Sequence, residues 1–356
     1  MEDGHGGNIK KLAETAGCRP SEIHDFSANI NPLGPPKCVR KATKRGLLRI
    51  EHYPEPWASE FATAVADHHG ISPQMVVPGA GSTQLIYALP QVLNTKRMVL
   101  PVPCYIDYAR AAFRAGLKLR KVQLNENDGF IFDPGKLGKD LRTGDLVVFG
   151  RPNNPTGLMV GASEIKAMAG NHGDCFIAVD EAFIEFVGKA ADLIEKLPEN
   201  VVLLRSLTKF YAVPGIRLGY AICEKDLAES LKNYLPPWSL GILAQEVGEA
   251  LMTDTGQYRE RTRHVVDQAR RRLYGDLAEI QGLTVYPGKA NFLLVRIDRD
   301  DTDAVELFDQ LLQDRIAIRV CDNYDGLDSR FFRVAVRSEG ENDVFLGSLS
   351  RAFQEL

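Results

Sequence analysis

Short apolar or β-branched runs alternate with stretches of helical spacing through the middle of the chain, and this alternation constrains the fold more than any other feature. The runs lie at residues 97–101, 118–124, 146–150, 175–180, 201–206 and 217–223. Stretches with helical spacing separate some of them, at residues 106–115, 162–170 and 191–197. Such alternation is typical of a mainly parallel sheet with helices on both faces. Several runs lack a regular two-residue alternation, which fits strands that are buried on both faces.

The pattern changes at about residue 240. Long helical stretches come first, at 240–252 and 257–280, and further strands are predicted at 283–286, 292–296, 316–320 and 331–336, with helices at 303–313 and 341–353. A chain of 356 residues suits about two domains. We therefore predict an α/β protein with a large domain at 36–240 and a small α+β domain at 241–356. Residues 1–35 are rich in Gly, Asn and Pro, which favours an irregular arm that joins the small domain.

The charge balance is close to neutral, with 43 Lys and Arg against 47 Asp and Glu and a formal net charge of −4. This balance gives no electrostatic footprint for nucleic acid or an anionic membrane. No apolar run is long enough to span a membrane. The 6 cysteines are widely spaced and show no zinc-ligand pattern, so we expect no metal site. The polar N-terminus gives no sign of a signal peptide, and we expect a cytoplasmic protein.

Polar residues follow several of the predicted strands. Asn154 lies in Asn153-Asn154-Pro155-Thr156-Gly157 after the strand at 146–150, and Asp180 ends the next strand. Ser206 and Lys209 follow the strand at 201–206. Because ligands bind beyond the carboxyl ends of strands in open parallel sheets, these residues are candidates for one site.

A glycine-rich turn precedes the helical stretch that follows Val76 and Val77. Gly81, Ser82 and Thr83 offer backbone N–H groups and two hydroxyls to a phosphate. Gln84 stands where the third glycine of a dinucleotide fingerprint would be, which disfavours a nicotinamide dehydrogenase. By itself the segment is equally a tight turn before a helix.

Lys209 and Asp180 have both a chemical and a structural interpretation. A lysine at the buried end of a strand can lose its charge and form a Schiff base with a carbonyl, including that of pyridoxal phosphate. A carboxylate such as Asp180 can face the pyridine nitrogen of the same cofactor. Taken singly, Lys209 could also be a surface lysine on a loop, and Asp180 could cap a helix.

The order of the motifs is more specific than any one of them. A glycine-rich turn, Tyr105 after a strand, the Asn-Asn-Pro-Thr-Gly segment, Asp-Glu-Ala-Phe at 180–183, Ser-Leu-Thr-Lys at 206–209 and a downstream arginine follow one another. This order resembles the class I/II aminotransferase superfamily of fold-type I pyridoxal-phosphate enzymes, from residue 26 to residue 353. The resemblance implies pyridoxal 5'-phosphate as cofactor, and a seven-stranded, mainly parallel sheet beside a smaller α+β domain.

The resemblance also implies roles for individual residues. Lys209 would bind the cofactor covalently, Asp180 would face its pyridine nitrogen, Asn154 would donate to its ring hydroxyl, and Tyr105 would stack on its ring. The residues implied for the cofactor's phosphate are Gly81, Ser82, Thr83, Ser206 and Arg217.

Two further positions follow from the same resemblance. Tyr53 would reach the phosphate bound by a neighbouring subunit, which implies a homodimer with shared active sites. Phe183 stands where many relatives have a tyrosine that donates a second hydrogen bond to the ring hydroxyl.

Other segments resemble one branch of this family, the threonine-phosphate decarboxylases. They are His5-Gly6-Gly7-Asn8, residues 25–34, Pro237-Trp238-Ser239, residues 321–324 and residues 331–337. The resemblance implies decarboxylation of L-threonine O-3-phosphate to the aminopropanol phosphate linker of cobalamin. The chain also shares motifs with histidinol-phosphate aminotransferases, so transamination with 2-oxoglutarate and glutamate is the alternative. A DNA-binding regulator on this fold would need an added segment, and we expect none before residue 26 or after residue 353.

A phosphorylated amino acid needs cations at both of its anionic ends. The family places arginines at Arg319 and Arg333 for the carboxylate and phosphate, and Arg333 can act as a bidentate fork. We add Arg337, four residues further along the predicted strand and so on the same face, although a solvated arginine at a strand end would look the same.

Other candidates for substrate binding come from the N-terminal arm and the Asn-Asn segment. His5 could cover the substrate phosphate, Asn29 and Ile30 could add donors, and Asn154 could contact the substrate as well. The motifs leave open whether the Cα–carboxylate or the Cα–H bond breaks. They also leave open whether the substrate is threonine phosphate or serine phosphate, which differ by one methyl group worth about 1–3 kcal/mol.

Overall fold

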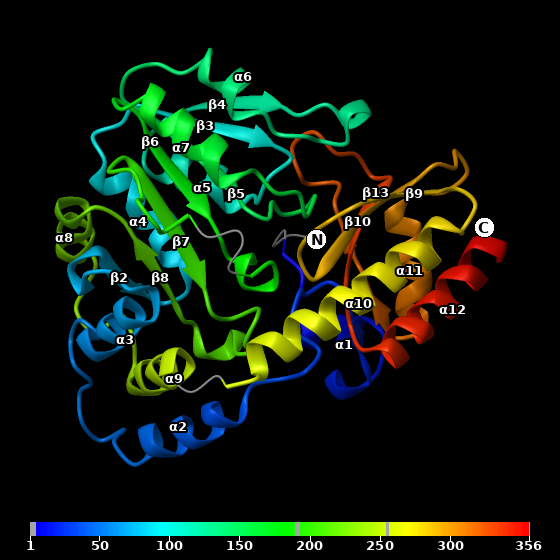
Figure 1. The fold of residues 1–356 in the computed structure, drawn as a ribbon. Helices are drawn as coiled ribbons and strands as arrows, with labels where there is room; N and C mark the ends of the chain where they lie inside the picture. The colour runs from blue at the N-terminus through cyan, green and yellow to red at the C-terminus, as the bar shows by residue number, and fades with distance from the viewer. Residues whose placement is uncertain (1–4, 189–192, 254–255, 356) are drawn as a thin grey trace.

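The structure, a computed structural model, describes residues 5–188, 193–253 and 256–355. Its largest sheet has seven strands in the order β2-β8-β7-β6-β5-β3-β4 (Figure 1). The strands are β2 (Val76–Gly79), β3 (Arg97–Val102), β4 (Lys118–Gln123), β5 (Asp145–Gly150), β6 (Phe176–Asp180), β7 (Val201–Ser206) and β8 (Gly219–Ile222). Only β8 runs antiparallel to its neighbours. The predicted seven-stranded, mainly parallel sheet is confirmed.

Both faces of this sheet are buried except along the edge strand β4, none of whose residues is buried. Within β6, Ile177 and Val179 belong to one apolar cluster and Ala178 to the other. One cluster includes α4 (Ser82–Val92), α5 (Asp107–Arg114) and α8 (Lys225–Tyr234); the other includes α2 (Lys37–Leu47), α3 (Ser59–His69), α7 (Ala162–Asn171) and α9 (Ile242–Thr253). Because successive side chains point to opposite faces, burial of both faces explains the continuous apolar runs in the sequence.

A second sheet lies on the other side of the molecule (Figure 1). Its four strands are antiparallel, in the order β12 (Arg319–Val320), β13 (Phe331–Ala335), β10 (Phe292–Ile297) and β9 (Leu283–Tyr286). The helices beside it are α10 (Tyr258–Ala278), α11 (Ala304–Gln313) and α12 (Glu339–Glu355) (Figure 1). This part of the chain is the predicted α+β region.

The N-terminal segment is more regular than predicted. It contains α1 (Ile9–Thr15), whose first turn is capped by the side chain of Asn8, and β1 (His24–Asp25). β1 pairs in parallel with β11 (Ile316–Ala317), and Leu12 of α1 is buried in the same cluster as Ala317. The expectation of an irregular arm was therefore wrong for α1, because an N-cap and two buried apolar side chains suffice to form a short helix.

The structure corrects three other predicted elements. Residues 193–197 of the predicted helix at 191–197 are irregular, with a turn at 195 and 196 in which Lys196 has a left-handed φ of 53°. Residues 191 and 192 lie outside the described residues. The predicted strand at 316–320 is divided between β11 and β12, because these pair with β1 and β13 in different sheets. The strand predicted to begin at Arg217 begins at Gly219, since Arg217 has a left-handed φ of 56°.

The predicted domain boundary near residue 240 stays a prediction. α9 lies just beyond it in the sequence, and packs against α2 and α3. The shorter helix α6 (Pro134–Gly138) packs against α7. No helix in the described part of the chain is long and apolar enough to cross a membrane.

Candidate active site

A cavity lies at the carboxyl ends of β5, β6 and β7. Residues of the N-terminal segment and of the four-stranded sheet, called the small sheet below, complete its wall. This is the edge at which an open parallel sheet binds its ligands. The predicted site residues that line the cavity are His5, Asn29, Ser82, Thr83, Tyr105, Asn154, Asp180, Ser206, Lys209, Arg217, Arg319 and Arg333. Folding therefore brings together candidates that are more than 300 positions apart in the sequence.

Lys209 is half-buried at this cavity. Burial lowers the pKa of its amine to about 8, and the positive charges of Arg333 and Arg217 act in the same direction, whereas Asp25 opposes them. The amine therefore has a substantial neutral fraction near physiological pH, which a lysine needs in order to attack a carbonyl carbon.

Asp180 is held by two donors. Its Oδ2 accepts a hydrogen bond from the hydroxyl of Tyr108 at 2.8 Å, and its Oδ1 accepts one from the backbone N–H of Ala182 at 3.0 Å. Burial raises the pKa of Asp180 to about 6, although both donors favour the ionised form. The carboxylate is thus fixed in orientation and ionised above about pH 6.

Tyr105 is anchored by Asp107, the first residue of α5. The Tyr105 hydroxyl donates to Asp107 Oδ2 at 2.7 Å, and its ring packs edge-on against Tyr108 with the centroids 5.6 Å apart. Asp107 also lies 3.6 Å from Nε2 of His5, whose ring is 5.8 Å from that of Tyr105. The start of α5 therefore fixes both the aromatic wall and the N-terminal residue that covers it.

Two buried arginines reach the cavity from the small sheet. Arg333 donates through Nη1 to Asn154 Oδ1 at 2.5 Å and through Nη2 to the carbonyl of Ser27 at 2.8 Å, and its buried Nε has no partner among the described residues. Arg319 lies 5.2 Å from the ring centre of Tyr324 and donates to Asn323. Two desolvated cations beside a cavity favour an anionic ligand.

Asn154 also accepts a hydrogen bond from the Tyr324 hydroxyl at 3.2 Å. Both Tyr324 and Tyr108 line the cavity, and neither was predicted as a site residue. Tyr108 stands in the first turn of α5, three residues after Tyr105, but Tyr105 precedes that helix and no residue pattern predicted the contact of Tyr108 with Asp180. Tyr324 belongs to a segment that we quoted for the family resemblance, but no residue pattern predicted its contact with Asn154.

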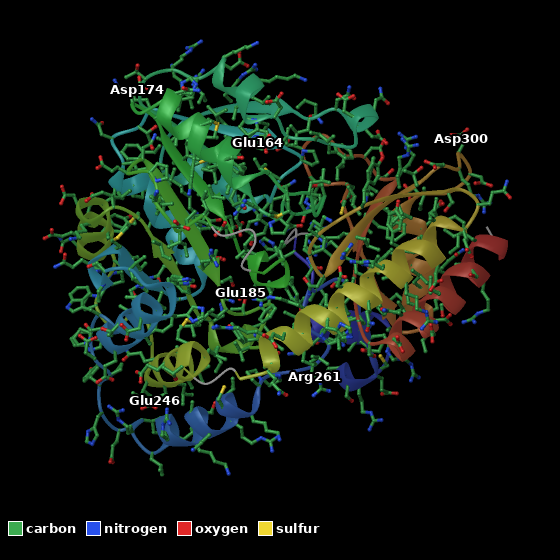
Figure 2. The ribbon with its side chains drawn as sticks, viewed as in Figure 1. Glu164, Asp174, Glu185, Glu246, Arg261 and Asp300 are labelled. Carbon is green, nitrogen blue, oxygen red and sulfur yellow. The ribbon has the colours of Figure 1, made fainter. Side chains whose placement is uncertain are left out.

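A buried ion network lies beside the cavity. Glu181, which follows Asp180, pairs with Arg151 at 2.5 Å and with Arg205 at 2.7 Å, and all three side chains are almost fully buried. Glu185, which is labelled in Figure 2, pairs with a residue of α10, since its carboxylate lies 3.2 Å from Nη2 of Arg263. These pairs join the ends of β5, β6 and β7 to one another and to α10. They therefore support the strand ends that carry Asp180 and Ser206 and the loop that carries Asn154.

Four predicted residues do not line the cavity. Gly81 lies beside it with a left-handed φ of 77°, and a Cβ at this position would be 2.7 Å from Arg217 Nη2, so glycine leaves room for the guanidinium. The backbone N–H of Ile30 bonds to Ala28. Tyr53 is 84% exposed and packs against Trp238.

The fourth residue, Arg337, corrects our argument from strand geometry. β13 ends at Ala335, so Arg337 does not continue the face that carries Arg333. Its guanidinium instead pairs with Glu341 of α12 at 2.7 Å. The i, i+4 argument was therefore wrong, because it assumed a strand longer than the one that forms.

Comparison with known proteins gives the family. The model of the aminotransferase class I and II family matches residues 21–349 of the chain. The chain belongs to this family. It is 38% identical to threonine-phosphate decarboxylase of Salmonella typhimurium over 97% of this chain and 95% of that protein.

Two other matches come from a longer protein and from a solved structure. The chain is 32% identical to the adenosylcobalamin biosynthesis bifunctional protein CobDQ of Leptospira interrogans, over 98% of this chain and 41% of that longer protein. The crystal structure of histidinol-phosphate aminotransferase from Clostridium acetobutylicum matches with a TM-score of 0.87 and 28% identity. It covers 93% of this chain and 99% of that chain.

The residues of this member of the aminotransferase class I and II family fit pyridoxal phosphate. Ser82 begins α4, whose N-terminus offers backbone donors to a phosphate, and the guanidinium of Arg217 lies against Gly81 beside it. The hydroxyls of Ser206 and Thr208 are 2.8 Å apart at the same cavity. The cavity also offers a partner for each reactive part of the cofactor. The amine of Lys209 suits the aldehyde, the carboxylate of Asp180 suits the pyridine nitrogen, and the ring of Tyr105 suits the aromatic ring.

Proposed function

We propose that this family member is a pyridoxal-phosphate-dependent decarboxylase that converts L-threonine O-3-phosphate to CO2 and (R)-1-amino-2-propanol O-2-phosphate. The second product is the linker of the cobalamin nucleotide loop. The observation that carries the proposal is that two buried arginines, Arg319 and Arg333, line the same cavity as Lys209. They suit a substrate with two anionic groups. The relatives named for threonine-phosphate decarboxylation and adenosylcobalamin biosynthesis, at 38% and 32% identity, support the same activity.

The chain would hold the cofactor through residues at the strand ends. Lys209 would bind its aldehyde carbon, Asp180 would retain the proton of its pyridine nitrogen, and Tyr105 would stack on its ring. Asn154 would donate to the ring hydroxyl. The phosphate would be held by the start of α4 with Gly81, Ser82 and Thr83, together with Ser206 and Arg217.

The mechanism that we propose assigns proton and anion binding to different residues. When bound, pyridoxal phosphate supplies an electron sink for the pair left on Cα when a bond to that carbon breaks. Arg333 and Arg319 bind the carboxylate and phosphate of the substrate, and so fix its rotation about Cα. The Cα–carboxylate bond would then break, its electron pair would pass to that sink, and CO2 would leave. The amine of Lys209, freed when the substrate amine takes its place, would return a proton to Cα. His5 and Asn29 exclude water from the same cavity.

A homodimer with shared active sites is part of the proposal. Tyr53, which is 84% exposed, would contact the cofactor phosphate of a second copy. Large apolar side chains surround it in the sequence, with Leu48 at 83% and Ile50 at 65% exposed. Such a concentration of exposed apolar residues is typical of a contact surface. We also place the enzyme in the reducing cytosol, since all 6 cysteines are free thiols.

The deciding experiment incubates the purified protein with pyridoxal phosphate and L-threonine O-3-phosphate. We expect release of CO2 and formation of aminopropanol phosphate without any keto acid. L-Serine O-phosphate as substrate tests the preference for the methyl group. Lys209→Ala should abolish both the product and the visible absorption, near ~420 nm, of the lysine-bound cofactor.

The alternative is a histidinol-phosphate-type aminotransferase. The observation that favours it is the TM-score of 0.87 to histidinol-phosphate aminotransferase from Clostridium acetobutylicum. All cofactor contacts proposed above would be the same, because only the substrate orientation differs. Amino transfer from histidinol phosphate to 2-oxoglutarate, without CO2 release, would establish this alternative and overturn the decarboxylase proposal.

A further inference from the structure

The side-chain amide of Asn154 is held at one end only. Its Oδ1 accepts hydrogen bonds from Arg333 Nη1 at 2.5 Å and from the Tyr324 hydroxyl at 3.2 Å. No hydrogen bond from its Nδ2 to another described residue is present. Because an amide has one acceptor end and one donor end, two donors on Oδ1 leave the NH2 group as the end available to a ligand in the cavity.

Arg333 and Tyr324 differ as anchors for this amide. Arg333 is the proposed ligand of the substrate carboxylate, so substrate binding competes for its guanidinium. Tyr324 is 4% exposed, its ring lies 5.2 Å from the guanidinium carbon of Arg319, and its hydroxyl donates to Asn154. The contact from Tyr324 therefore does not depend on whether a carboxylate is bound.

Other aromatic residues of the cavity cannot replace Asn154 as a donor. The hydroxyls of Tyr105 and Tyr108 already donate to carboxylates. Phe183, which lines the cavity and packs edge-on against Phe292 with the ring centroids 5.0 Å apart, carries no donor. The orientation of the Asn154 amide therefore decides whether the cofactor's ring hydroxyl has a side-chain donor from this part of the wall.

We propose that Tyr324 is a positioning residue, which fixes the amide of Asn154 so that its NH2 group faces the ring hydroxyl of the bound cofactor. The inference rests on the proposed function, since it requires pyridoxal phosphate in this cavity. A donor to the ring oxygen stabilises the anionic form of that oxygen, and so disfavours a proton on the lysine-bound nitrogen beside it. Without Tyr324 the amide keeps only the contact from Arg333, so its NH2 group is held less firmly and the proton is retained to higher pH.

The experiment titrates the visible absorption of the holoenzyme between about pH 5 and 10, without substrate. The charged groups that face Lys209, namely Arg333, Arg217 and Asp25, are unchanged in each variant. We expect Tyr324→Phe to raise the pH midpoint by roughly half a unit, and Asn154→Ala to raise it by more. In the Asn154→Ala background, Tyr324→Phe should add nothing, because its effect passes through that amide.

The matched control is Tyr286→Phe. Tyr286 is a buried tyrosine of β9 and belongs to the same apolar cluster as Tyr324. Its hydroxyl donates to Glu126 at 2.7 Å, and the residue does not line the cavity. This variant should titrate as the wild type does. Since Tyr324→Phe removes one oxygen and keeps the ring, we expect it to fold, and thermal unfolding of both variants checks this.

The outcomes separate the inference from the function on which it rests. An unchanged midpoint in Tyr324→Phe, or an equal shift with and without Asn154, overturns the positioning role. A wild-type protein that shows no visible band after incubation with pyridoxal phosphate overturns the proposed cofactor chemistry itself.

Discussion

Burial sets the charge of the two titratable groups on which the proposed chemistry depends. It lowers the pKa of the Lys209 amine to about 8 and raises that of the Asp180 carboxyl to about 6. The two values therefore move toward each other, into the range in which cells work. Near pH 7 the carboxylate is mostly ionised, while part of the lysine is neutral, as the proposed roles require.

The raised pKa of Asp180 predicts a pH-dependent effect on stability. A carboxyl whose pKa is higher in the folded than in the unfolded state destabilises the fold at high pH, and the penalty disappears as pH falls from about 6 to below the ordinary pKa of 3.8. Asp180→Asn removes this charge. In the cofactor-free protein we expect the free energy of unfolding at pH 8 to rise by about 1–3 kcal/mol.

Urea unfolding at pH 8 and pH 4 checks this prediction. The variant should gain stability at pH 8 and little or none at pH 4, and it should bind pyridoxal phosphate more weakly at both. A gain that is equal at the two pH values would show that the charge of Asp180 is not the cause.

A second prediction concerns the two arginines four residues apart. Arg333→Lys keeps the charge but loses the planar fork, so we expect kcat/KM for the phosphorylated substrate to fall by about 10²–10³. Arg337→Gln is the control, because its guanidinium pairs with Glu341 outside the cavity. We expect steady-state kinetics of that variant within about twofold of wild type. If Arg337→Gln lowered kcat/KM as much as Arg333→Lys does, Arg337 would have to be counted as a substrate-binding residue after all.

Among the elements, most strands of the large sheet lie where the sequence predicted them, the exposed edge strand β4 included. β3, β5, β6 and β7 begin and end within one residue of the expected runs, because apolar side chains are needed at every position between two helical layers. β11 and β12 are different. Each has two residues, and only the partners in two separate sheets decide where one ends and the other begins.

The N-terminal segment allows a prediction at the scale of elements. His5 lines the cavity and lies 3.6 Å from Asp107 at the start of α5. If it covers the substrate phosphate, His5→Gln should raise KM by roughly tenfold with little change in kcat. Lys10→Ala, in the exposed face of α1, is the control and should leave both constants unchanged. A fall in kcat of His5→Gln by roughly tenfold, with no change in KM, would contradict a role of His5 in phosphate binding.

At the scale of the whole molecule, the cavity depends on two sheets that are formed by different parts of the chain, the seven-stranded sheet and the four-stranded sheet. The large sheet supplies the cofactor residues, and β12 and β13 supply the arginines proposed for the substrate. The ion pair between Glu185 and Arg263 connects the large-sheet side to α10.

The proposed dimer allows a test by mixing. Tyr53→Ala and Lys209→Ala should each be nearly inactive alone. In a mixed dimer, one site contains the wild-type Lys209 of one copy and the wild-type Tyr53 of the other, so mixing the two variants under exchange conditions should recover activity. Light scattering gives the oligomeric state. Recovery should be absent if Tyr53 serves the site of its own chain.

The sequence by itself determined the sheet, the order of the cofactor motifs and most candidate residues, because these depend on local runs and on fixed spacing. It could not determine which donors surround each candidate. Tyr108 reaches Asp180, and Tyr324 reaches Asn154 across 170 positions, only because the chain folds back on itself. Arg337 failed for the same reason, since its environment is set by where β13 ends and α12 begins. Contacts between distant segments follow from the packing of whole elements, and only the tertiary structure decides that packing.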